Sequence, residues 1–158
     1  MAGFAIPAAV GLGLAGVLAP VQLVSWKPLA VRTNALLWIL YVGYACIGLG
    51  LLMAALALAG VDIPRVLPVH MIAMAGFSVL IIGMVTRTAL GHTGRPLATD
   101  RTIRASYWLM LIAVGLRLAA IAATPASTAL LHMAALAWMA SLALYLWQFT
   151  PILIRPRA

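Results

Sequence analysis

The sequence predicts an all-α protein, a polytopic bundle of about five membrane-spanning helices that forms a single transmembrane domain over residues 1–158. Two observations predict this class. Of the residues, 66% are hydrophobic and only 8% are charged, whereas about a quarter of the residues in a soluble domain are charged. The apolar residues also form long stretches separated by short polar loops. Such stretches become helices in a bilayer, because lipid cannot satisfy open backbone groups.

Each apolar stretch is near or above the roughly 20 residues that cross the hydrocarbon core. We expect the spans at residues 2–24, 34–59, 66–88, 103–123 and 128–150. No Lys or Arg precedes the first stretch, so we expect a retained helix rather than a cleaved signal peptide. The only cysteine, Cys46, lies inside the second stretch, where it is expected to pack as a small hydrophobic residue.

The charged residues lie almost entirely between the apolar stretches, so the net charge of +8 predicts topology rather than nucleic-acid binding. The first loop, the third loop and the C-terminus are basic, whereas in the second loop Asp62 offsets Arg65 and the fourth loop has no charge. The positive-inside rule then predicts an N-terminus outside the cytoplasm and a C-terminus within it.

Three ionisable residues stand out in the predicted spans, where each is costly and is expected to have a partner: His70, Arg117 and His132. At 1.5 Å per residue, all three lie roughly 6–9 Å below the outer boundary. Two histidines at one depth could ligate a haem iron from opposite sides, with Arg117 paired to a propionate. The alternative is that the histidines only hydrogen-bond to neighbouring helices and that Arg117 extends to the surface.

Methionines accompany these histidines. Met74 follows His70 by one helical turn and lies on the same face, and a thioether beside an imidazole suits reduced copper. The alternative is that the methionines only fill the hydrophobic interior. Copper is therefore a second candidate cofactor.

A distinctive loop follows the third span. The helix is predicted to end near Leu90, with Gly91 as the residue in the left-handed conformation. Arg87, His92 and Arg95 project from this region, where they could bind an anionic group, a haem propionate or a partner protein. A basic loop that only sets topology explains the arginines but not a histidine between two glycines.

The stretch from Arg87 through Leu90-Gly-His-Thr-Gly-Arg-Pro-Leu97, on the helix that His70 opens, resembles the NnrS family. The stretch that begins at Asn34-Ala-Leu-Leu-Trp, Arg117 and the region of Trp138 are also similar to that family. The resemblance covers roughly residues 30–155 and corresponds to the C-terminal part of the family, whose members usually have more spans.

The resemblance implies a protein of the bacterial inner membrane that takes part in the nitric-oxide response and holds haem b and copper. It carries over His70, Arg87, His92 and Arg95 as candidate site residues; His132 and Arg117 depend more on their matched depth. Ligands from the part of the family that this chain lacks would come from a second copy of the chain, in a homo-oligomer, or from a second membrane subunit.

His70 and His92 cannot ligate one metal from a straight helix, so if both bind cofactors they serve separate sites. A non-catalytic accessory subunit with structural histidines is the alternative function. The only acids, Asp62 and Asp100, are in loops, which leaves few groups for acid–base catalysis and decides neither for nor against an enzyme.

Overall fold

The computed structural model describes residues 5–122 and 125–154. Within these ranges the elements are all helical: α1 (Ala5–Ser25), η2 (Pro28–Val31), α2 (Ala35–Leu58), α3 (Val66–His70), η3 (Met71–Ser78), α4 (Val79–His92), α5 (Arg101–Ala119), η4 (Ala120–Ala122) and α6 (Ser127–Leu153). The π-helix η3 joins α3 to α4, so Val66–His92 forms one continuous span. Five helices are thus long and apolar enough to cross a membrane, which confirms the predicted class.

The predicted start of the first span at residue 2 and the predicted end of the fourth span at residue 123 lie outside the described residues. Asn34 caps α2 as its side chain accepts a hydrogen bond from the Leu36 amide, at 3.1 Å. Asp100 caps α5 in the same way through the Ile103 amide, at 2.8 Å, so α5 begins slightly before the predicted residue 103. The third span continues to His92 rather than ending at residue 88. Pro151 lies within the last turn of α6, which continues to Leu153.

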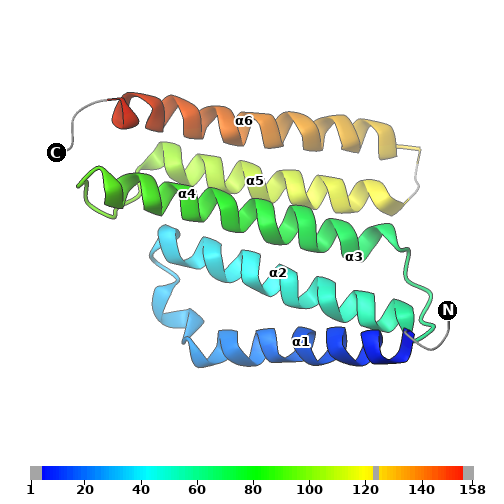
Figure 1. The fold of residues 1–158 in the computed structure, drawn as a ribbon. Helices are drawn as coiled ribbons and strands as arrows, with labels where there is room; N and C mark the ends of the chain where they lie inside the picture. The colour runs from blue at the N-terminus through cyan, green and yellow to red at the C-terminus, as the bar shows by residue number, and fades with distance from the viewer. Residues whose placement is uncertain (1–4, 123–124, 155–158) are drawn as a thin grey trace.

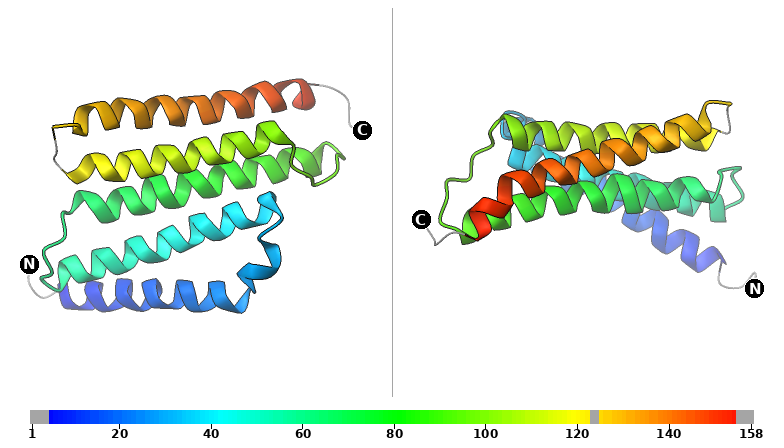
Figure 2. Two further views of the ribbon diagram at one scale, coloured as in Figure 1. Left: turned by 180° about the vertical axis from the view of Figure 1, so that it is seen from behind. Right: turned by 90° about the horizontal axis from the view of Figure 1, so that it is seen from above.

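The spans lie side by side in chain order, with α1 and α6 at the two edges (Figures 1 and 2). α1 packs mainly on α2, and α6 packs mainly on α5. The loop that contains Asp62 lies at one end of the bundle, here called the Asp62 end. The loop that contains Asp100 lies at the other, the Asp100 end.

Glycines allow α2 to pack tightly against the third span. A Cβ atom added to Gly76 would lie 2.5 Å from Cγ1 of Ile47, and one added to Gly43 would lie 2.8 Å from Cγ of Leu80. Lipid tails are as apolar as the helix surfaces, so close van der Waals contact between small residues is what holds such helices together. The same contact fixes the part of the third span that contains η3.

A pair of serines joins α5 to α6. Oγ of Ser106 donates to the Ser141 carbonyl at 2.9 Å, and Oγ of Ser141 donates to the Ser106 carbonyl at 2.7 Å. Both residues are buried, so each hydroxyl is satisfied across the helix pair rather than by water. The exchange fixes the register of α6, which supplies one wall of the candidate site.

Candidate functional site

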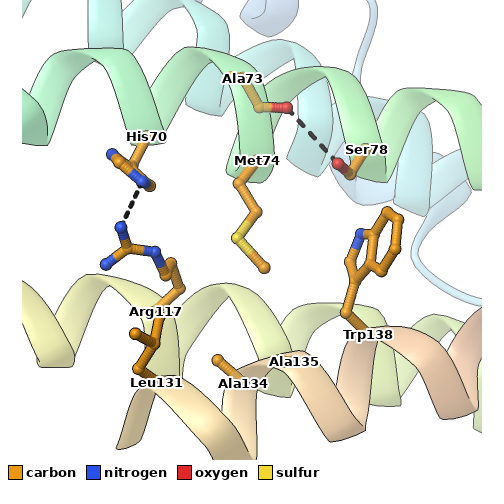
Figure 3. Close-up of a pocket in the computed structure, with 9 residues that line it drawn as sticks. All are labelled: His70, Ala73, Met74, Ser78, Arg117, Leu131, Ala134, Ala135 and Trp138. Carbon is orange, nitrogen blue, oxygen red and sulfur yellow. Dashed lines mark hydrogen bonds between the residues drawn. The ribbon is translucent and has the colours of Figure 1, made fainter. Parts of the chain in front are cut away.

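A cavity of about 440 Å³ lies between the third span, α5 and α6 towards the Asp62 end (Figure 3). Its polar lining consists of His70 and Ser78 on the third span and of Arg117 on the facing side, where Trp138 also lies. The other lining residues are apolar: Ala73, Met74, Leu131, Ala134 and Ala135. The volume falls within the range of about 300–1,000 Å³ that is typical of small-molecule and cofactor sites.

His70 is held by hydrogen bonds at both ring nitrogens. Nδ1 lies 2.8 Å from the Val66 carbonyl oxygen, and Nε2 lies 2.6 Å from Nη2 of Arg117. A carbonyl can only accept and a guanidinium can only donate. The arrangement therefore requires the neutral tautomer with the proton on Nδ1, and Nε2 accepts from Arg117. A backbone carbonyl on the remote nitrogen is also the usual support for a metal-ligating histidine.

Arg117 lies near the C-terminal end of α5, where the helix dipole favours a cation. The two acids of the chain are in loops, and Asp100 lies at the other end of the bundle. The described hydrogen bond of Arg117 is to His70. The cavity thus contains a half-buried cation that faces an imidazole rather than a carboxylate, and such a cation can pair with an incoming anionic group.

The cavity wall from the third span is π-helical. Met74 lines the cavity one turn beyond His70, and Ser78 follows one turn beyond Met74 (Figure 3). Oγ of Ser78 donates to the carbonyl of Ala73 at 3.5 Å. Turns of π-helix inside α-helices are frequent at functional sites. The sequence spacing indicated His70 and Met74 on one face, and Ser78 continues that spacing but was missed.

His132 lies outside this cavity. Leu131, Ala134, Ala135 and Trp138 present the cavity face of α6 at helical spacing. His132 comes one residue after Leu131, which turns it by about 100° around the helix, and its side chain is exposed. The structure therefore brings together His70 and Arg117, two of the three residues predicted at one depth, but not His132.

The residues predicted at the Asp100 end reach separate partners. Nη1 of Arg95 donates to the Ile152 carbonyl at the end of α6, at 3.4 Å. His92 lines a different cavity of about 320 Å³ with Tyr145 and Leu153 of α6. Arg87 is half-buried and lies five residues before His92 in α4. Because Val66–His92 is continuous, His92 and His70 lie at opposite ends of the bundle.

Gly94, not Gly91, is the left-handed residue that ends the third span, with φ of +73°. Its amide donates to the Gly91 carbonyl at 3.3 Å, and the Arg95 amide donates to the Leu90 carbonyl at 3.0 Å. These two bonds form a Schellman motif, which satisfies carbonyls left open at the helix end. The prediction of Gly91 was wrong because Gly91 lies within α4, and this places His92 in the last turn of the helix.

In the described residues, no group of three or more His, Cys, Asp or Glu side chains could by itself hold a metal ion. The donors at the His70 cavity are one imidazole, one thioether and one serine hydroxyl, with Arg117 as the cation. One imidazole can hold a haem iron, and one guanidinium can pair with a propionate. The residues present therefore fit a haem held from one side, whereas a closed protein cage for a bare metal would need more donors.

No curated protein and no solved structure matches the chain. The model of one protein family, the NnrS protein, matches residues 1–157. That match extends beyond the predicted residues 30–155 to nearly the whole chain, so the first span is also part of the family's pattern. The chain belongs to the NnrS family, and this membership fits a membrane protein of the nitric-oxide response.

Proposed function

We propose that the protein binds haem b in the His70 cavity and acts in the nitric-oxide response or in respiratory redox chemistry. The observation that carries the proposal is the orientation of His70. Its Nδ1 is bound to the Val66 carbonyl, so Nε2 is the nitrogen available to the cavity. Family membership supports the same function.

In this proposal Nε2 of His70 ligates the iron and Arg117 pairs with a propionate. Arg117 now donates to Nε2, so binding requires its guanidinium to move from the nitrogen to the carboxylate. Both are acceptors, and a charged acceptor makes a stronger hydrogen bond to a guanidinium than a neutral one. A haem held by His70 and Arg117 would supply iron for gas binding or electron transfer.

The other two predicted ligands, His132 and His92, would belong to a site shared with another chain or to a separate site. His132 is exposed on α6, so it could complete a site with a second copy of the chain or a second membrane subunit. His92 lies at the Asp100 end with Arg87 and Arg95, which are the alternative propionate partners. We also infer an inner-membrane location from the family membership. A periplasmic N-terminus follows from the basic residues in or beside the loops at the Asp100 end, which are Arg32, Arg87, Arg95, Arg101 and Arg104.

Copper is the second candidate cofactor. His70 and Met74 line one cavity from adjacent turns, so an imidazole and a thioether face the same space. Soft sulfur ligands favour reduced copper. Both donors come from one helix, so they could bind a metal from one side but could not fill opposite axial positions of a haem.

The deciding experiment is the absorption spectrum and metal content of the protein purified in detergent from haem-sufficient, copper-sufficient cells. We expect a Soret band whose intensity per protein falls at least about tenfold in His70→Ala. His92→Ala is the matched control, on the same span but in another cavity, and should keep the band. Met74→Leu should leave haem unchanged and lower copper content if copper binds.

A colourless, metal-free wild-type protein would reject cofactor binding and favour the accessory-subunit function. A Soret band that survives in His70→Ala but disappears in His92→Ala would place the haem at the Asp100 end instead. Loss of the band in His132→Ala as well as His70→Ala, together with a dimeric elution volume, would indicate a haem shared between two chains.

A further inference from the structure

A second basic cavity, distinct from the His70 cavity, opens between α2 and α5 at the Asp100 end. It has a volume of about 530 Å³. Its walls include Arg32, Trp38 and Tyr41 on the α2 side. Arg104, Trp108 and Leu111 of α5 form the facing wall. None of these residues takes part in the site proposed above.

Among the residues that the structure describes, no carboxylate neutralises the two arginines at this cavity. The chain has two acids, and Asp62 lies at the opposite end of the bundle. The carboxylate of Asp100 accepts hydrogen bonds from the Ile103 amide and from Nε2 of Gln148. Arg104 donates instead to the Asp100 backbone carbonyl, at 3.3 Å. The positive charge of Arg32 and Arg104 is therefore available to an anion from outside the protein.

Aromatic rings form the body of the cavity between the two helices. The rings of Trp38 and Trp108 lie 5.6 Å apart, and those of Trp38 and Tyr107 lie 6.4 Å apart, edge to face. The hydroxyl of Tyr41 donates to the Trp26 carbonyl at 2.8 Å, which fixes its ring. Trp and Tyr favour the level of lipid headgroups because their rings are apolar with a polar tip.

The polarity of the cavity changes with depth. Arg104 lies about 4–5 Å from the start of α5, whereas Leu111 lies about 15 Å from it at 1.5 Å per residue. Along α5, Arg104 is thus nearest the helix start, Trp108 follows at about 10 Å and Leu111 is deepest. This sequence of charge, aromatic ring and aliphatic chain matches the headgroup, glycerol and acyl regions of a phospholipid.

We propose that this cavity binds one anionic phospholipid, whose phosphate pairs with Arg32 and Arg104 and whose acyl chains follow Leu111 into the bilayer. Basic pockets between membrane helices commonly bind anionic headgroups. A second copy of this chain is disfavoured as the occupant, because it would also carry a net charge of +8. The proposal does not depend on the function proposed for the His70 cavity.

The test is native mass spectrometry of the detergent-solubilised full chain, mixed with equal concentrations of phosphatidylglycerol and phosphatidylcholine. We expect the wild type to prefer phosphatidylglycerol by about tenfold, given the attraction of two arginines to an anionic lipid. The double variant Arg32→Gln/Arg104→Gln should reduce the preference to near unity. Arg32→Lys/Arg104→Lys keeps the charge and should keep most of the preference.

Arg101→Gln is the matched control, because Arg101 opens the same helix, is exposed and does not line the cavity. An Arg101→Gln variant that loses as much preference as the double glutamine variant would overturn the proposal and indicate diffuse attraction to a basic surface. A double glutamine variant that elutes as wild type and keeps its preference would overturn it as well. Glycerol phosphate in excess should leave lipid binding intact; full competition would show that an anion alone fills the site and would also reject the lipid.

Discussion

The two halves of the third span differ in helix type and in how their polar residues find partners. The half near the Asp62 end contains the π-helix η3, packs closely on α2 and presents His70 to Arg117 of another helix. The half near the Asp100 end is the regular helix α4, which ends in a Schellman motif. Arg95, just beyond it, donates to a backbone carbonyl of α6.

The two halves differ in which groups complete the hydrogen bonds of their polar side chains. Near the Asp62 end, His70 and Arg117 face an otherwise mostly apolar cavity, so their side chains pair directly. Near the Asp100 end, helix termini leave carbonyls open, and a basic side chain can use them. The paired half is therefore the one in which substitutions should be most costly.

The largest expected effect is at the glycine that packs η3 against α2. Gly76→Ala would place a Cβ atom 2.5 Å from Cγ1 of Ile47, and we expect a loss of about 2 kcal/mol in the free energy of unfolding from overpacking. Gly91→Ala in the other half meets nothing within 4 Å. It should be neutral or stabilise by about 0.5–1 kcal/mol. Unfolding by SDS in mixed micelles, followed by circular dichroism, measures both; equal effects would remove the contrast.

A smaller effect is expected from the side-chain pair. Arg117→Met leaves Nε2 of His70 without its donor, and we expect a loss of about 1–2 kcal/mol. Arg95→Met removes a longer bond to the Ile152 carbonyl, 3.4 Å in length, and should lose less than about 1 kcal/mol. The same SDS titration compares them. A greater loss in Arg95→Met would mean that the Asp100 end, rather than the paired half, carries the stability.

The smallest effect concerns the end of α4. Gly94 has φ of +73°, so Gly94→Ala should cost about 1 kcal/mol because L-residues are strained in the left-handed region. Gly91→Ala, three residues earlier and within the helix, should not destabilise the protein. Hydrogen exchange at the Arg95 amide, which donates to the Leu90 carbonyl, should accelerate in the first variant alone. Faster exchange in Gly91→Ala would support the helix end predicted from sequence.

Much of the fold could be predicted because lipid imposes simple rules. Five apolar stretches gave five spans, and Asn34 marked the start of α2. The choice between Gly91 and Gly94 could not be predicted, since both precede polar residues and the helix end is decided by which carbonyls remain open. The π-helix was also not predicted, because it accompanies close packing against a distant part of the chain.

The sequence predicted the depth of the site residues in the membrane but not which way their side chains point. Counting residues from the span ends predicted the same depth for His70 and Arg117, and in the structure the two side chains form a hydrogen bond. The same count gave His132 that level, but it faces away from the cavity. A helix such as α6 is apolar towards both lipid and protein, with Leu136 and Leu146 well exposed outside the cavity. Hydrophobic periodicity therefore does not reveal which side of it faces inward.

The hydrogen bond between Arg117 and His70 makes the arginine an internal competitor for the lone pair of Nε2. Any metal that approaches His70 must displace a donor that is tethered beside it at a high local concentration. A bare cation would gain only the bond to Nε2 and would be repelled by the positive charge of the Arg117 guanidinium. A cofactor that brings its own carboxylate gives the displaced guanidinium a new acceptor. In the proposed site, the pair would therefore favour metal complexes with an anionic arm over free metal ions.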